Sequence, residues 1–101
     1  MIHVVASITI KPGQVPAFLD AFKAIVPTVL AETGCIQYTP TLDVDIGVSV
    51  QQLDANVVTI VEQWESVEAL QAHLIAPHMQ TYRETVKDLV VSASLKVLAD
   101  A

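Results

Sequence analysis

The chain has 101 residues, which suits one domain (1–101) that buries only about 60–65 % of the surface of its unfolded form. Hydrophobic residues make up 52 % of the sequence and charged residues 16 %, so a monomer would leave apolar surface exposed and a homodimer is expected. The net charge of −6 disfavours nucleic acid and anionic membranes as partners. No apolar run approaches the roughly 18 residues of a membrane span, and we expect a cytoplasmic protein.

The N-terminal third of the chain predicts a strand followed by a helix. Residues 2–10 alternate in their side-chain character with a period of two, which is typical of a strand, and residues 11–13 end it. From residue 15 the apolar side chains change to helical spacing, and this helix is expected to close at Gly34. Pro27 lies inside the helix and predicts a bend, because proline removes one backbone hydrogen bond.

The middle of the chain combines a clear strand with a segment that resists assignment. Residues 36–42 again alternate, and Pro40 among them favours an edge strand or a bulge. Residues 44–56 lack a steady period, although Val48 and Val50 could form a short strand there.

The only tryptophan lies at the end of a predicted third strand. Residues 57–61 are rich in β-branched side chains, so Glu62 and Trp64 should follow at the end of that strand, two apart and on one face. Ser66 can then cap a helix, which Pro77 should stop or bend.

His73 is predicted to face the sheet. At about 100° per residue it shares one helical stripe with Ala69 and Leu70, and this stripe should pack against the strand that carries Trp64. Residues 79–86 continue at helical spacing, and residues 89–98 predict a last strand. The order is then β-α-β-β-α-β, an α+β fold of the ferredoxin-like kind with a four-stranded antiparallel sheet and its helices on one face. Face-to-face pairing of two such sheets in a symmetric dimer would cover the face that the helices leave open.

Neither a metal nor an organic cofactor is expected. His73 and His78 are five residues apart, about 140° around a continuous helix, so they should not converge on one ion. No glycine-rich nucleotide fingerprint is present, and Cys35 is alone.

Several short motifs lie at the ends of the predicted elements in a fixed order. They are Lys11-Pro12-Gly13, Gly34-Cys35 with Tyr38, Glu62-x-Trp64, Ala69-Leu70-x-x-His73 and Pro77-His78. This set resembles the antibiotic biosynthesis monooxygenase family, whose members include quinol monooxygenases, and it spans essentially the whole chain. The resemblance implies a homodimeric α+β barrel with one pocket per subunit, and oxygenation of a small aromatic substrate by O2 without metal or organic cofactor.

The resemblance also suggests roles for particular residues. His73 is the candidate catalytic base, because its ordinary pKa of about 6.5 suits proton transfer near neutral pH. It could equally be a core histidine whose ring bonds a backbone carbonyl or Glu62, just as Trp64 could be simple core and Glu62 a structural carboxylate. The candidate substrate-binding residues are Trp64, Glu62, His78, Tyr38 and Tyr82.

Three functions stay open on the sequence alone. The first is a cofactor-independent monooxygenase acting on a quinol or polyphenol, and the second is a noncatalytic ligand-binding or stress-response dimer of the same fold. The third, haem degradation, ranks last: haem-degrading relatives use an asparagine on the first strand, where this chain has Ala6 and Ser7.

Overall fold

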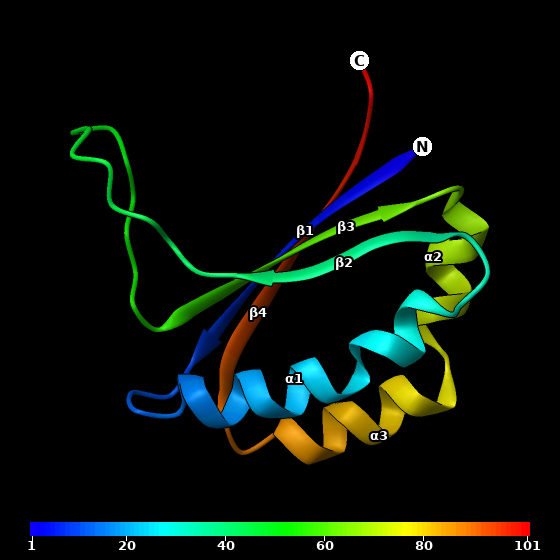
Figure 1. The fold of residues 1–101 in the computed structure, drawn as a ribbon, viewed down its shortest axis with the longest axis horizontal. Coiled ribbons are helices and arrows are strands. Elements are labelled where there is room, and N and C mark those ends of the chain that lie inside the picture. Colours follow the sequence, from blue (N-terminus) through cyan, green and yellow to red (C-terminus); the bar gives the residue numbers. More distant parts are fainter.

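The sheet and its helices form two layers (Figure 1). The computed structural model describes residues 1–101, with β1 (Ile2–Ile10), α1 (Val15–Leu30), β2 (Cys35–Thr41), β3 (Val57–Trp64), α2 (Val67–Leu74), α3 (Pro77–Val86) and β4 (Val90–Ala99). The strands are antiparallel in the order β2-β3-β1-β4, and all three helices cover the same face. This confirms the predicted ferredoxin-like α+β class, with the Pro40 strand at an edge. No helix of the chain is both long and apolar enough to span a membrane.

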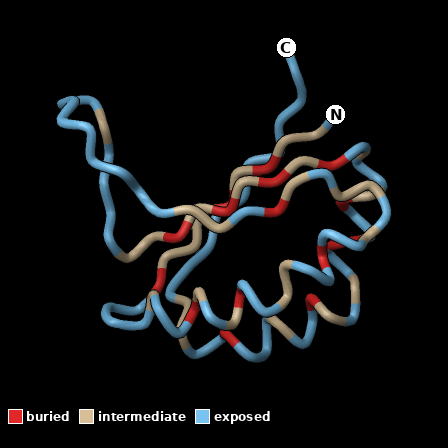
Figure 2. Tube along the Cα trace, viewed as in Figure 1, coloured by how far each residue is buried: buried red, intermediate tan, exposed pale blue.

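The core lies between the two layers, as the distribution of buried residues in Figure 2 shows. Along β3 every second residue is buried, and the buried set includes both Glu62 and Trp64, as the period of two predicted. The facing side of α1 buries Phe18, Phe22 and Val29. A thin core of this kind places two charged or titratable side chains, Glu62 and His73, among the apolar ones.

The helical segment after β3 contains two helices where the predicted element order had one, and they are separated just before Pro77, where a stop or bend was predicted. Helix α2 ends at Leu74, and Pro77 is the first residue of α3. A proline disfavours helical conformation in the residue before it, and Ala76 is accordingly extended, with φ −61° and ψ 141°. The chain therefore changes direction between His73 and His78.

The first helix also ends earlier than predicted. It is a single helix that contains Pro27, but its last residue is Leu30, four residues before Gly34. Gly34 instead forms the turn into β2 with φ +85°, and a Cβ atom placed there would lie 2.7 Å from the Ala69 Cβ. The resulting turn brings Glu32, which lies within it, close to α2.

Residues 42–56 form an irregular arm that projects from the ends of β2 and β3 (Figure 1). The short strand suggested for Val48 and Val50 is absent, and both side chains are exposed. Local hydrogen bonds organise the arm, among them one from the Asp54 backbone N–H to the Asp43 carboxylate at 2.8 Å.

Candidate functional site

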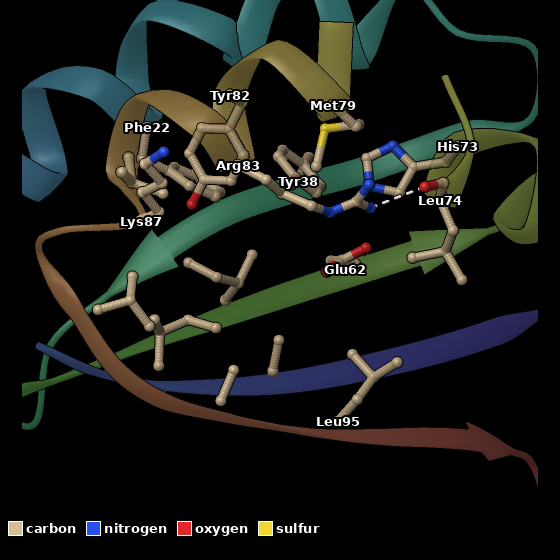
Figure 3. Close-up of a pocket in the computed structure, with 16 residues that line it drawn as sticks. Phe22, Tyr38, Glu62, His73, Leu74, Met79, Tyr82, Arg83, Lys87 and Leu95 are labelled. Carbon is tan, nitrogen blue, oxygen red and sulfur yellow. Dashed lines mark hydrogen bonds between the residues drawn. The ribbon is translucent and has the colours of Figure 1, made fainter. Parts of the chain in front are cut away.

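A cavity of about 410 Å³ lies between the sheet and the helices. Most of its 16 lining residues are hydrophobic, and its size is within the range of small-molecule sites. Figure 3 shows the polar groups converging on it from β2, β3 and the two later helices. The lining side chains with polar atoms are Tyr38, Glu62, His73, Tyr82, Arg83 and Lys87.

His73 is held rigidly at one end of this cavity. Helix α2 begins with the predicted cap, in which the Ala69 backbone N–H donates to Ser66 Oγ at 3.1 Å. The His73 side chain is 2 % exposed, and its ring centroid lies 4.7 Å from that of Trp64 and 5.2 Å from that of Tyr38. The predicted orientation toward the Trp64 strand is confirmed. Burial lowers the pKa of His73, so the imidazole favours its neutral form.

The partner of His73 is Glu32, a residue that the sequence analysis missed. His73 Nδ1 lies 2.9 Å from Glu32 Oε2, and His78 Nε2 lies 2.8 Å from the same oxygen. The expectation that the two histidines diverge is wrong, because the break before Pro77 ends the continuous helix on which it was based. A partner for His73 at a backbone carbonyl or at Glu62 was wrong too. The only signal for Glu32 in the sequence is its place just before the Gly34 turn.

Glu32, His73 and His78 are also the one group of residues whose donor atoms approach a metal-ligand set, all within 4.8 Å of one another. In this structure the three side chains are joined by hydrogen bonds. Both histidine nitrogens are at hydrogen-bond distance from a single carboxylate oxygen, and an ion about 2.0–2.1 Å from each donor would have to displace both bonds. We therefore describe the group as a hydrogen-bonded triad.

The second nitrogen of the His73 ring faces the cavity. Nδ1 is engaged with Glu32, whereas Nε2 has no protein partner. No side-chain nitrogen or oxygen of the chain is both fully buried and without a hydrogen-bond partner. Because Nε2 has no partner, it is not fully buried, and since His73 lines the cavity, a molecule bound in the cavity can reach it. In Figure 3 the Arg83 side chain extends toward this ring, and its guanidinium donates to the Leu74 carbonyl at 2.7 Å.

Glu62 and Trp64 form a buried pair on β3. The Trp64 indole Nε1–H donates to Glu62 Oε1 at 2.9 Å, and burial raises the pKa of the Glu62 carboxyl, a shift that this hydrogen bond opposes. Glu62 lines the cavity, but Trp64 is fully buried and is not part of the cavity wall. Trp64 thus orients Glu62 and packs against His73.

Two tyrosines provide the hydroxyl groups of the cavity. The Tyr38 and Tyr82 rings pack against Phe22, with centroids 5.1 and 5.8 Å from the Phe22 centroid. Burial raises the pKa of both phenols, so both stay protonated and can donate hydrogen bonds. Both residues were candidates from the sequence, whereas Lys87, which also lines the cavity, was not.

His78 does not line this cavity. It lies on a separate, smaller hollow of about 340 Å³ between α1 and α3, and its side chain is 28 % exposed. Of the five candidate substrate-binding residues, the structure thus brings Glu62, Tyr38 and Tyr82 to the cavity wall with His73. Trp64 and His78 are not part of that wall.

Comparisons with known proteins agree on one family. The family model for antibiotic biosynthesis monooxygenase matches residues 1–85. The chain is 45 % identical over 100 residues to the "Probable quinol monooxygenase YgiN" of Escherichia coli strain K12, covering 97 % of this chain and 96 % of that protein. A conserved protein from Methanosarcina mazei Go1 superposes with a TM-score of 0.85 at 21 % identity, over 99 % of this chain and 92 % of that one. An antibiotic biosynthesis monooxygenase of known structure gives 0.82 at 20 % identity, over 100 % and 99 %. At identities of 20–21 %, these two structures support the fold alone.

Proposed function

Since the chain belongs to the antibiotic biosynthesis monooxygenase family and is therefore a monooxygenase, we propose that it oxidises a small aromatic of the quinol or polyphenol type with O2 and without a cofactor. The observation that carries this proposal is the free Nε2 of a neutral, buried histidine at the wall of an apolar cavity. Such a nitrogen can accept a phenolic proton. The 45 % identity to a protein named as a quinol monooxygenase supports the substrate class.

The reaction begins when a substrate hydroxyl transfers its proton to His73 Nε2. The phenolate that forms is electron-rich enough to reduce O2 directly, so the substrate supplies all four electrons. Two come from conversion of the quinol to the quinone, and two from replacement of a ring C–H by C–OH. One oxygen atom enters the ring and the other leaves as water, which gives a hydroxyquinone and H2O from one quinol and one O2.

The other polar groups of the cavity orient the substrate and stabilise its negative charge. The hydroxyls of Tyr38 and Tyr82 donate hydrogen bonds to substrate oxygens, and the Arg83 guanidinium favours the phenolate over the neutral phenol. One carboxylate oxygen of Glu62 accepts a hydrogen bond from a second hydroxyl of the substrate, while the other accepts from the Trp64 indole N–H. The apolar wall keeps water away from the reactive intermediate.

The test compares turnover of the wild type with that of His73→Gln and His73→Ala on hydroquinones and naphthohydroquinones. Gln fills most of the same volume but is no base near neutral pH, so both variants should lose roughly 10²-fold or more in kcat. Circular dichroism and thermal unfolding check that the fold is kept. Retained turnover in His73→Gln would assign the proton to another acceptor, and binding without turnover by the wild type would favour the noncatalytic ligand-binding alternative.

We also propose that the working unit is a homodimer paired through the outer sheet face. That face carries Val5, Val57 and Val61, all half-buried although no helix covers them, and the exposed apolar side chains of the 42–56 arm add to the unpaired surface. Sedimentation should give twice the chain mass of 10.9 kDa. A stable monomer at micromolar concentration would contradict this pairing.

A further inference from the structure

The triad of Glu32, His73 and His78 connects the cavity with the protein surface. Glu32 comes from the turn after α1, His73 from α2 and His78 from α3. The side-chain exposure rises from 2 % at His73 to 15 % at Glu32 and 28 % at His78. One carboxylate oxygen therefore serves an inner histidine at the cavity and an outer histidine in contact with solvent.

We propose that Glu32 is a positioning residue that sets the tautomer and basicity of His73, and that His78 opposes it by competing for the same carboxylate oxygen. The catalytic meaning of this inference rests on the proposed function, because only there does His73 accept a substrate proton. The arrangement itself is a property of the folded chain.

The tautomer follows from the chemistry of the carboxylate. An ionised carboxylate only accepts hydrogen bonds, so the hydrogen between Glu32 Oε2 and His73 Nδ1 belongs to the imidazole. A neutral imidazole carries one ring hydrogen, and with it on Nδ1 the lone pair is on Nε2, toward the cavity. When Nε2 takes a proton, the negative charge 2.9 Å from Nδ1 stabilises the imidazolium.

The charges around His73 act in opposite directions. The Glu32 carboxylate raises the pKa of His73, whereas burial, which has the largest effect, and the positive charges of His78 and Arg83 lower it. On the sheet side the ring meets Tyr38 and Trp64, which are uncharged, with Glu62 on the cavity wall beyond them. A protonated His78 both repels a proton on His73 and takes a share of the Glu32 charge.

Two conservative variants separate these effects. Glu32→Gln keeps a side-chain oxygen that can accept from Nδ1–H but removes the charge, so the pKa of His73 should fall by about one pH unit or more. His78→Gln keeps a donor to Glu32 but removes the cation, so the pKa of His73 should rise. Glu68→Gln, which removes one charge from the exposed side of the same helix as His73, is the matched control and should leave it unchanged.

The primary measurement is a pH titration of the His73 ring by ¹⁵N NMR, which reports the pKa and the protonated nitrogen without any substrate. The wild type should show Nδ1–H, and the two triad variants should shift in opposite directions. A predominant Nε2–H form, or shifts of the same sign in both variants, would overturn the inference.

Steady-state kinetics supply the second arm. Glu32→Gln should lower kcat about tenfold or more with KM little changed, and should move the acid limb of the pH profile to lower pH, whereas His78→Gln should move that limb to higher pH. A merely structural Glu32 would change stability without moving the limb. If the wild type turns over no quinol while the NMR shifts appear, the proposed function fails and the triad stands. If turnover is present and the NMR shifts are absent, the triad inference alone fails.

Discussion

Replacing Trp64 by phenylalanine isolates one buried hydrogen bond of the site. The indole Nε1–H donates to Glu62 Oε1 at 2.9 Å, and both side chains are buried. Phenylalanine keeps an aromatic ring against His73 but has no donor, so this buried carboxylate oxygen loses its hydrogen-bond partner.

The magnitude follows from two contributions. Leaving a buried polar group unsatisfied costs about 1–3 kcal/mol, and the smaller ring adds on the order of 1 kcal/mol for imperfect packing. A total loss of about 2–4 kcal/mol in unfolding free energy would lower Tm by roughly 10–25 °C in a domain of this size. Burial already raises the pKa of Glu62, and loss of the hydrogen bond raises it further. The folded variant then binds more protons than the unfolded chain above pH 4.5, so its stability falls as pH rises.

Urea unfolding followed by far-ultraviolet circular dichroism at pH 5 and pH 8 measures this effect. The loss caused by Trp64→Phe should be larger at pH 8. The matched control repeats the substitution in a Glu62→Gln background, where the amide carries no charge and the cost should shrink toward the packing contribution. A coupling energy between the Trp64 and Glu62 substitutions below about 0.3 kcal/mol would contradict a stabilising hydrogen bond between the two side chains. Equal losses of unfolding free energy at pH 5 and pH 8 would contradict it as well.

Three further outcomes are expected. Gly34→Ala should destabilise the fold by about 2 kcal/mol or more in urea unfolding, because φ is +85° and the new Cβ would meet Ala69. The control Gly13→Ala, with φ +81° and no neighbour within 4 Å, should lose less stability, and equal losses would contradict the close contact at Gly34. Burial raises the pKa of the Cys35 thiol from 9.0 to about 11, so its thiolate fraction at pH 7.5 should be about 100-fold lower than that of a free thiol of pKa 9. Because a more basic thiolate is also the better nucleophile, its alkylation by iodoacetamide should run about tenfold slower or more, and a comparable rate would refute the raised pKa. Because burial lowers the pKa of His73, the unfolded chain binds more protons than the folded one below pH 6.5, and the wild type should lose stability as pH falls through that value. His73→Gln should lose less stability over the same range. Identical slopes of unfolding free energy against pH would argue against a buried neutral ring.

Local patterns in the sequence were sufficient for much of the fold and for the inner part of the site. A period of two placed Glu62 and Trp64 on one buried face of β3. The Ser66 cap fixed the start of α2, and helical spacing then turned His73 toward the sheet. Each of these predictions depends on residues close together in the chain.

The parts that were missed depend on contacts between distant segments. Glu32 is 41 residues from His73 in the sequence, and nothing in its own neighbourhood predicts that contact. The angle between the two histidines was taken from a continuous helix although Pro77 was expected to stop or bend it, and the break before Pro77 brings His78 to Glu32. The apolar residues of the 42–56 arm have no regular period because the arm packs on no layer of this chain.

Labelling with ¹⁸O2 tests the central claim most directly. The purified protein is incubated with a naphthohydroquinone under ¹⁸O2, with His73→Gln and a protein-free sample alongside, and the products are analysed by mass spectrometry. We expect one ¹⁸O atom per molecule of hydroxyquinone and one in water, with formation of this product reduced roughly 10²-fold or more in the variant. Unlabelled quinone with release of hydrogen peroxide, at equal rates in all three samples, would contradict monooxygenation at this cavity.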